Sequence, residues 1–217
     1  MYFILPAAFM LGSVPFGILF TSKAGVDITK SGSGNIGATN VLRTAGKGPA
    51  VLTLLCDLLK GSLAVLLCRA MLNPMDLSVY SAEYISDYTD LWLGIACISV
   101  VLGHMYSVFL SFKGGKGVAT AFGVMLVYSP VTAFIVLGIW LATAMVFKYS
   151  SLAAIVAVCS MPIILILSGV SSIKLFIVLV LAINIIAKHR SNIAALIAGT
   201  EEPIGKKIAL QDEGILQ

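Results

Sequence analysis

The feature that most constrains this chain is a succession of long apolar blocks separated by short polar segments. The blocks cover residues 2–20, 49–72, 91–111, 118–128, 131–147, 151–168 and 173–187. A helix that crosses about 30 Å of hydrocarbon needs roughly 20 such residues in a row. Only 11% of the residues are charged, against about 25% in an ordinary soluble domain. We therefore expect lipid to be the solvent of this protein.

In lipid the backbone must satisfy its own hydrogen bonds within each span, and apolar blocks of this length predict helices rather than barrel strands. The sequence thus predicts an all-α fold with about seven transmembrane helices in one domain, residues 1–217. The block 118–128 is too short to cross comfortably, so it could tilt, join its neighbour near Pro130, or form a re-entrant piece. The first block is preceded by no basic residue and followed by no cleavage pattern, which indicates a retained span.

The charges between the blocks predict the orientation. Two segments carry the bases: Lys23, Lys30, Arg43 and Lys47, then Lys188, Arg190, Lys206 and Lys207. The segment 73–90 carries only acids: Asp76, Glu83, Asp87 and Asp90. Because basic loops stay in the cytoplasm, we expect the N-terminus outside and the C-terminus inside. Topology explains the bases better than nucleic-acid binding does.

The first polar cluster reads S-G-S-G-N-I-G-A-T-N-V-L-R at residues 31–43. Its glycines let the backbone turn several N–H groups toward one point, and its polar side chains add donors, a composition that suits an anion. A flexible polar loop is the alternative. The candidate ligands are Ser33, Gly34, Asn35, Thr39, Asn40 and Arg43. In the next block Asp57 and Lys60 are three residues apart, so an ion pair could orient Lys60 toward the same pocket.

The second cluster combines G-H at 103–104 with F-K-G-G-K-G-V-A-T at 112–120. Lysines among glycines, where the next helix should begin, predict a phosphate cradle built from backbone amides, the helix dipole and ammonium charge. The alternative is a glycine-rich basic anchor loop. The nucleotide P-loop pattern fails, since it needs Gly at Leu110 and Ser or Thr at Gly117. The candidates are His104, Lys113, Gly114, Gly115, Lys116 and Gly117.

The third cluster is K-H-R-S-N-I at 188–193, followed by Thr200 and Glu201. His189 and Asn192 are three apart, so on a continuing helix they would share a face, and His189 is a candidate acid or base. A basic helix end at the lipid surface is the alternative. Ser151, between the fifth and sixth long blocks, should lie on the same side. The four cysteines show no metal-ligand spacing, and we expect no metal and no cofactor.

The three motifs, in this order, resemble those of bacterial membrane glycerol-3-phosphate acyltransferases that use acyl-phosphate as donor. The resemblance covers essentially the whole chain. It implies seven helices, so 118–128 would count as one, and it implies functional roles for Ser33, Arg43, Lys116, His189 and Asn192 and for the glycines beside Lys116. Many family members have Arg at Ala195 and Pro at Ser107, so a substrate contact from either position is not expected here.

The implied reaction is attack of the 1-hydroxyl of glycerol 3-phosphate on the carbonyl of a fatty acyl-phosphate, giving lysophosphatidic acid and inorganic phosphate. An acyl-phosphate is already activated, so positioning and charge stabilisation would suffice. The proton would go to His189 or to a substrate phosphate. The resemblance also implies a bacterial inner membrane, a cytoplasmic site and a soluble phosphate acyltransferase as donor supplier. A transporter or a lipid-binding scaffold is the rival class.

Overall fold

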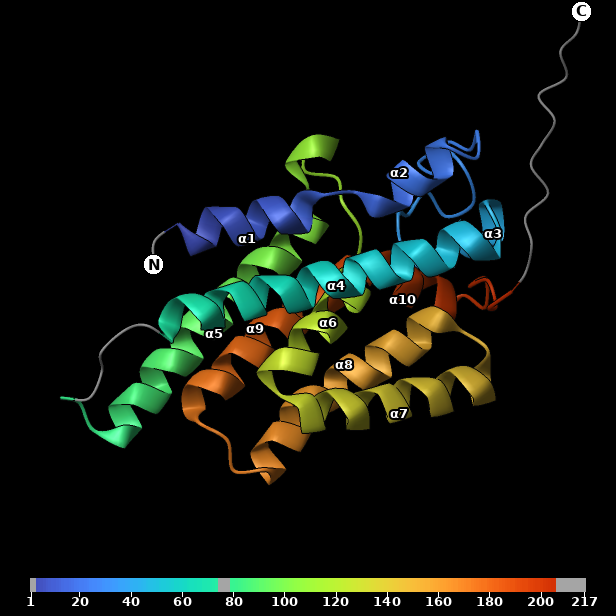
Figure 1. The fold of residues 1–217 in the computed structure, drawn as a ribbon. Coiled ribbons are helices and arrows are strands. Elements are labelled where there is room, and N and C mark those ends of the chain that lie inside the picture. Colours follow the sequence, from blue (N-terminus) through green and yellow to red (C-terminus); the bar gives the residue numbers. More distant parts are fainter. Residues whose placement is uncertain (1–2, 74–78, 206–217) are drawn as a thin grey trace, which may run out of the picture.

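The computed structural model describes residues 3–73 and 79–205, and within these ranges all the regular secondary structure is helical (Figure 1). The α-helices are α1 (Ile4–Ser13), α2 (Phe16–Ser22), α3 (Ala38–Thr44), α4 (Lys47–Leu72), α5 (Ala82–Met105), α6 (Val118–Tyr128), α7 (Pro130–Phe147), α8 (Ser150–Leu167), α9 (Ser172–Lys188) and α10 (Arg190–Ile197). A single 3₁₀ turn, η1 (Val108–Leu110), follows α5.

Within the described ranges, five helical segments are long and apolar enough to cross a membrane, and a sixth forms if α9 and α10, bent by 57°, are counted as one span. The expected seventh, α6, begins and ends where the short block was predicted. It has 11 residues and rises only about 16 Å, half the thickness of the hydrocarbon. The predicted membrane helices are therefore present, but α6 is too short to count by length.

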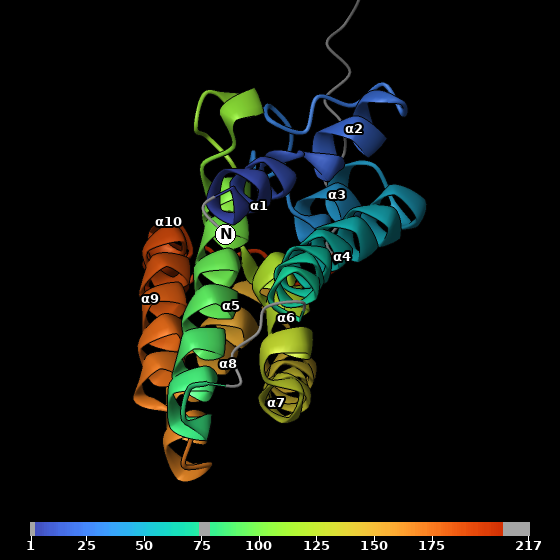
Figure 2. The ribbon, with the colours of Figure 1, turned by 60° about the vertical axis from the view of Figure 1, so that its left-hand side comes forward.

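The short helix α6 lies inside the bundle, in contact with α4, α5 and α7 (Figure 2). Its approach to α4 is close enough to require glycine. A Cβ on Gly61 would lie 2.2 Å from the carbonyl oxygen of Thr120, and one on Gly123 would lie 1.9 Å from that of Leu58. Large apolar side chains on the outer helices, such as Leu59 and Phe134, are exposed, as expected for a surface that faces lipid.

Two boundaries differ from the sequence prediction. The acidic segment 73–90 was expected to be a loop, but α5 begins at Ala82, so Glu83, Asp87 and Asp90 lie on its first turns. Ser81 caps this helix by accepting the N–H of Tyr84 at 3.2 Å, and acids near a helix N-terminus are favourable. Asp76, Lys206 and Lys207, used in the orientation argument, lie outside the described residues.

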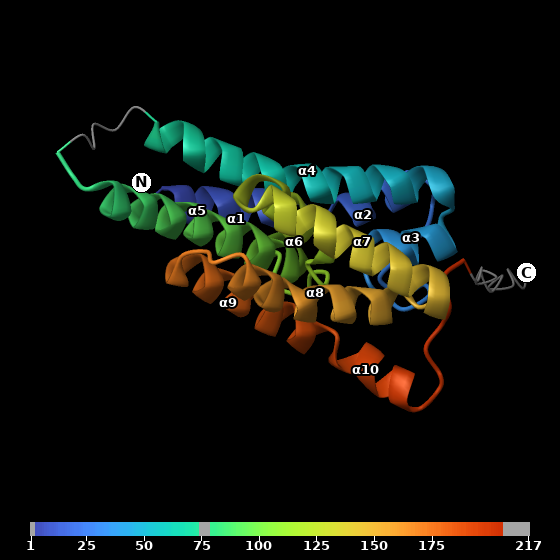
Figure 3. The ribbon, with the colours of Figure 1, turned by 90° about the horizontal axis from the view of Figure 1, so that it is seen from below.

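The first apolar block is also interrupted, because Val14 and Pro15 separate α1 from α2. Proline has no N–H to continue the helix. The segments that follow α2, α5, α7 and α9 gather near one end of the bundle (Figure 3). Residues from the segments that follow α2, α5 and α9 line one cavity together with Ser150 and Ser151, the first two residues of α8. The expectation that the polar clusters share a side is therefore confirmed.

Candidate active site

The cavity, about 560 Å³ in volume, opens between α4, α6, α7 and α8. Its polar end is lined by Ser33, Asn35, Thr39, Asn40, Arg43, Asp57, His104, Lys116, Ser151, His189, Asn192 and Glu201. Its other end is apolar and includes Leu58, Met125, Val136, Trp140, Ala157 and Met161. An adjoining recess of about 370 Å³ shares five of the polar residues with it: Ser33, Asn35, Lys116, Asn192 and Glu201.

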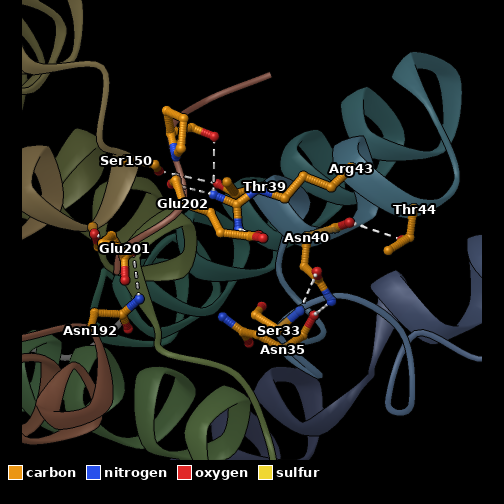
Figure 4. Close-up of polar contacts among 12 residues, drawn as sticks. Ser33, Asn35, Thr39, Asn40, Arg43, Thr44, Ser150, Asn192, Glu201 and Glu202 are labelled. Carbon is orange, nitrogen blue, oxygen red and sulfur yellow. Dashed lines mark hydrogen bonds and ion pairs between the residues drawn. The ribbon is translucent and has the colours of Figure 1, made fainter. Parts of the chain in front are cut away.

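Asn40 shapes the first polar cluster. Its buried amide accepts the N–H of Ser33 at 3.0 Å and donates to the carbonyl oxygens of Ser31 at 3.0 Å and Asn35 at 2.9 Å (Figure 4). The loop 31–37 is thus wrapped around one side chain. Asn40 was expected to contact substrate, but the loop already occupies both ends of its amide, which supports a shaping role instead.

Arg43 lies on α3, a helix that the sequence reading treated as loop. One terminal nitrogen donates to the carbonyl oxygen of Glu202 at 2.7 Å, and the other lies 3.4 Å from the Glu202 carboxylate (Figure 4). The side chain is 8% exposed, and its Nε has no hydrogen-bond partner among the described residues. The guanidinium is therefore fixed at the cavity wall with one donor uncommitted.

The glycine-rich segment 113–117 has a different construction from the predicted cradle. The N–H groups of Gly114 and Gly115 donate to the carbonyl oxygens of Met105 at 3.1 Å and His104 at 3.0 Å, so these two amides are not available to a phosphate. Only Gly117 of this segment has a positive φ, 82°, where α6 begins. A Cβ on Gly115 would lie 2.3 Å from Nε2 of His104, so this glycine permits close packing on the ring.

Lys116 reaches the polar end of the cavity, where its ammonium donates to the side-chain oxygen of Asn192. Asn192 in turn donates to a carboxylate oxygen of Glu201 at 2.8 Å, and Ser151 donates to the same oxygen at 2.6 Å. This chain of contacts joins the segment before α6 to α10 and α8. Burial lowers the pKa of Lys116 below its ordinary value, with the charge of Arg43 acting in the same direction and that of Glu201 opposing it.

His189 lies at the bend between α9 and α10, so the helix does not continue through this residue as predicted. Its Nδ1 is 2.7 Å from the carbonyl oxygen of Ile185. A carbonyl can only accept, so Nδ1 carries the proton in the neutral ring and Nε2 keeps a lone pair. His189 and Asn192 still line the same cavity, because the bend turns the first turn of α10 across its wall.

Two expected site residues do not line the cavity or the recess. Lys113 is exposed. Lys60 forms the predicted ion pair with Asp57 at 2.7 Å but points away from the cavity and donates to the carbonyl oxygen of Val14 at 3.0 Å. Gly34, Gly114 and Gly115 line the recess but not the cavity, whereas Gly117 lines the cavity.

Several polar lining residues were not among the predicted site residues. Ser150, whose hydroxyl lies 3.1 Å from that of Thr39, and Glu202 both belong to the cavity wall. The pairing of Glu201 with Glu202 next to a basic helix end was the only sequence signal for the latter. Within residues 3–73 and 79–205, no group of three or more His, Cys, Asp or Glu side chains is placed to hold a metal ion.

Comparison with known proteins gives one consistent result. Residues 2–199 match the family model for glycerol-3-phosphate acyltransferase. The chain is 46% identical over 200 residues to the glycerol-3-phosphate acyltransferase of Mesorhizobium japonicum, covering 92% of this chain and 93% of that one. It is 42% identical over 204 residues to the corresponding protein of Dechloromonas aromatica, covering 94% and 96%.

Two crystal structures of PlsY (YgiH), an integral membrane glycerol 3-phosphate acyltransferase, have the same fold. The glycerol 3-phosphate form superposes with a TM-score of 0.82 at 38% identity, and covers 94% of this chain and 95% of that one. The lysophosphatidic acid form gives 0.80, at the same identity and coverage. With its polar motifs gathered at one end of a helical membrane fold, this chain belongs to the glycerol-3-phosphate acyltransferase family.

Proposed function

We propose that this acyltransferase moves a fatty acyl group from acyl-phosphate to the 1-hydroxyl of glycerol 3-phosphate. The observation that carries the proposal is one cavity with two chemically different ends. Two cations, Lys116 and Arg43, stand at its polar end, and an apolar groove between α4, α6, α7 and α8 continues from there. A phosphate-bearing polyol and an acyl chain with a phosphate leaving group fit these two ends. The neighbouring structures with glycerol 3-phosphate and lysophosphatidic acid support the acceptor and the product.

The polar end supplies the charge stabilisation that the reaction needs. The hydroxyl oxygen bonds to the acyl carbonyl carbon, the bond from that carbon to the phosphate oxygen breaks, and inorganic phosphate leaves. Lys116 and Arg43 would hold the two phosphate groups, and Ser33 and Asn192 would donate to the oxygen atoms that gain charge. An acyl-phosphate already has a good leaving group, so transfer is direct and needs no acyl-enzyme.

The hydroxyl proton goes either to Nε2 of His189, whose Nδ1 is fixed on Ile185, or to a phosphate oxygen of the substrate. His189→Gln separates the two routes. If the imidazole is the acceptor, kcat should fall in this variant. The decline of wild-type kcat at acidic pH should also disappear, a decline expected because burial lowers the pKa of His189 and the ring becomes protonated only in acid. If a phosphate oxygen accepts, the pH dependence should remain that of the substrate.

The purified protein in bilayers tests the proposal directly. It is given acyl-phosphate and glycerol 3-phosphate, separately and together, while phosphate release is followed. Release that requires both substrates supports the transfer. Uptake of glycerol 3-phosphate into vesicles without release would indicate a transporter, and binding without turnover would indicate a scaffold; either result overturns the proposal.

We also propose that the chain forms one domain with seven crossings, counting α6, in the bacterial inner membrane. The N-terminus is outside, and the site faces the cytoplasm, where a soluble phosphate acyltransferase supplies the donor. Glu83, on α5, would then face outside and Lys116 inside. Single cysteines at these positions, in a variant without the four native cysteines, can be labelled in sealed cells. Labelling of position 116 from outside would contradict this orientation.

A further inference from the structure

Three ionisable side chains that the proposed reaction does not use are buried at the polar end of the cavity, two of them, Asp57 and His104, in its wall and Lys60 behind it. Asp57 and Lys60 come from α4, and His104 comes from α5. Their side chains are only 2–5% exposed. One carboxylate oxygen of Asp57 lies 2.7 Å from Nζ of Lys60 and 3.5 Å from Nδ1 of His104. Ionisable groups inside membrane proteins are costly, so a set with specific partners calls for a function.

The ring of His104 supports the glycine-rich segment. The backbone carbonyl oxygen of His104 accepts the N–H of Gly115 at 3.0 Å. A Cβ on Gly115 would lie 2.3 Å from Nε2, 3.0 Å from Cε1 and 3.1 Å from Cδ2 of the ring. The imidazole therefore lies directly against Cα of Gly115, and the next residue is Lys116. The position of the ring limits how closely this segment can approach α5.

The Asp57 carboxylate faces Nδ1 of the ring at 3.5 Å, where Nδ1 has no hydrogen-bond partner among the described residues, and Asp57 is itself paired with Lys60. Lys60, its partner, also donates to the carbonyl oxygen of Val14 at 3.0 Å, at the break between α1 and α2. The ammonium lies 5.6 Å from the ring centroid of Phe16, just beyond that break. The imidazole is thus confined between a carboxylate fixed on α4 and the backbone of the segment that carries Lys116.

We propose that His104, which lies between the Asp57 carboxylate and Gly115, is a positioning residue that sets the place of the Lys116 ammonium by supporting Gly115. The inference rests on the proposed function, because that function gives Lys116 a substrate phosphate to hold. His104 acts here through Lys116 and not by contact with the reacting atoms. Catalytic groups need support of this kind, since small displacements from the productive geometry lower rates strongly.

A double-mutant cycle between His104→Ala and Gly115→Ala tests the contact, with kcat/KM measured for acyl-phosphate and glycerol 3-phosphate. Each single variant should lose activity, Gly115→Ala because its methyl meets the ring. The kcat/KM of the double variant should be no lower than that of the less active single variant, because the methyl group added at position 115 then occupies the space that the imidazole ring has left. A departure from multiplied losses of about twofold or more indicates coupling between residues in contact. Losses that simply multiply would overturn the inference.

The dependence on Lys116 is tested by repeating His104→Ala in a Lys116→Ala background, assayed at high enzyme concentration. With no ammonium left to position, His104→Ala should then cost less than twofold. An equal loss in both backgrounds would mean that His104 contacts substrate or only stabilises the fold, and the inference would be wrong. Ser99→Ala is the control, because this buried hydroxyl on α5 donates within its own helix, to the carbonyl oxygen of Ile95.

Unfolding temperatures of the same variants separate this inference from the proposed function. The His104–Gly115 contact predicts that the two substitutions are coupled in stability too, whether or not the protein turns over acyl-phosphate. If the wild-type protein shows no turnover but the two substitutions are coupled in stability, the proposed function is contradicted and the His104–Gly115 contact is supported. An active wild type in which both activity and stability losses multiply would overturn the positioning role alone.

Discussion

Two of the polar clusters in this helical bundle differ in what their groups contact. The distal cluster consists of Asp90, Tyr128, Ser171 and Lys174, at the ends of helices away from the cavity. Asp90 accepts from Ser171 at 2.6 Å and pairs with Lys174 at 3.3 Å, and Tyr128 donates to the carbonyl oxygen of Asp90 at 3.0 Å. The site cluster of Lys116, Arg43 and their neighbours instead lines an open cavity.

The difference shows that charge near a span end does not by itself mark a site. In the distal cluster the lysine also lies over the ring of Tyr128, 5.0 Å from its centroid, and none of the four residues lines the cavity or the recess. In the site cluster the charged groups are partnered from one side and face the cavity on the other. A cluster whose groups contact one another away from the cavity stabilises the fold. A cluster that lines the cavity, which we call open, can exchange a protein partner for a ligand.

The largest effect is expected for Lys116→Ala. Losing a charge-assisted contact to a phosphate in a partly dehydrated site costs roughly 1.5–3 kcal/mol, so kcat/KM should fall by about tenfold to a hundredfold. Lys174→Ala in the distal cluster and Lys148→Ala in the α7–α8 loop are the matched controls for bulk positive charge. Equal losses in all three variants would show that the site cluster is an ordinary basic anchor.

A smaller and more selective effect is expected in the apolar groove. Ala157 is buried in its wall on α8, and Ala157→Leu should fill space that an acyl chain would occupy. Displacing about two methylenes costs roughly 1.6 kcal/mol, so kcat/KM for a long-chain donor should fall about tenfold while a short-chain donor is nearly unaffected. A series of acyl-phosphates of graded length measures this difference. Equal losses of kcat/KM at every length would show that the acyl chain of the donor binds elsewhere.

In the distal cluster we expect a change in stability and little change in activity. Asp90→Asn keeps an acceptor for Ser171 but removes the ion pair to the partly buried Lys174, which should cost about 1 kcal/mol of stability. Thermal unfolding in detergent measures the shift, and kcat/KM per folded molecule should stay within about twofold of wild type. A large loss of turnover without unfolding would mean that the distal cluster takes part in catalysis.

The most subtle effect is expected in the pH profile. Because burial lowers the pKa of Lys116, its ammonium should lose charge at a lower pH than an ordinary lysine does. Activity should therefore decline on the alkaline side as pH rises through this pKa. In Lys116→Arg, whose guanidinium stays charged, whatever activity remains should lack this decline. An unchanged alkaline limb would assign the decline to another group.

The membrane helices could be predicted from sequence because their limits follow hydrophobicity, a property of each segment alone. The block 118–128 became α6 with unchanged bounds. The limits that were missed depend on polar contacts. The helix α5 begins at Ala82, nine residues before the apolar block 91–111, because Ser81 caps it there among acidic residues. The helix α3 carries too few apolar residues to show helical periodicity.

The members of the site could be predicted largely from their motifs, but their contacts could not. Asn40 is occupied by its own loop, Lys60 by a carbonyl at the break between α1 and α2, and the amides of Gly114 and Gly115 by the end of α5. Each partner is a backbone group supplied by the way the chain folds. The spacing of residues along the sequence does not show such backbone partners, which is why the amides of Gly114 and Gly115 were expected to face a phosphate.

The most direct test of the comparison is a structure of this protein with glycerol 3-phosphate bound. The open site cluster predicts the phosphate in the cavity or its recess, within hydrogen-bonding distance of Lys116 or Arg43, with the distal cluster unchanged. A phosphate bound at Lys174 with the Asp90 pair broken, or one held only by exposed lysines such as Lys113, would contradict the account.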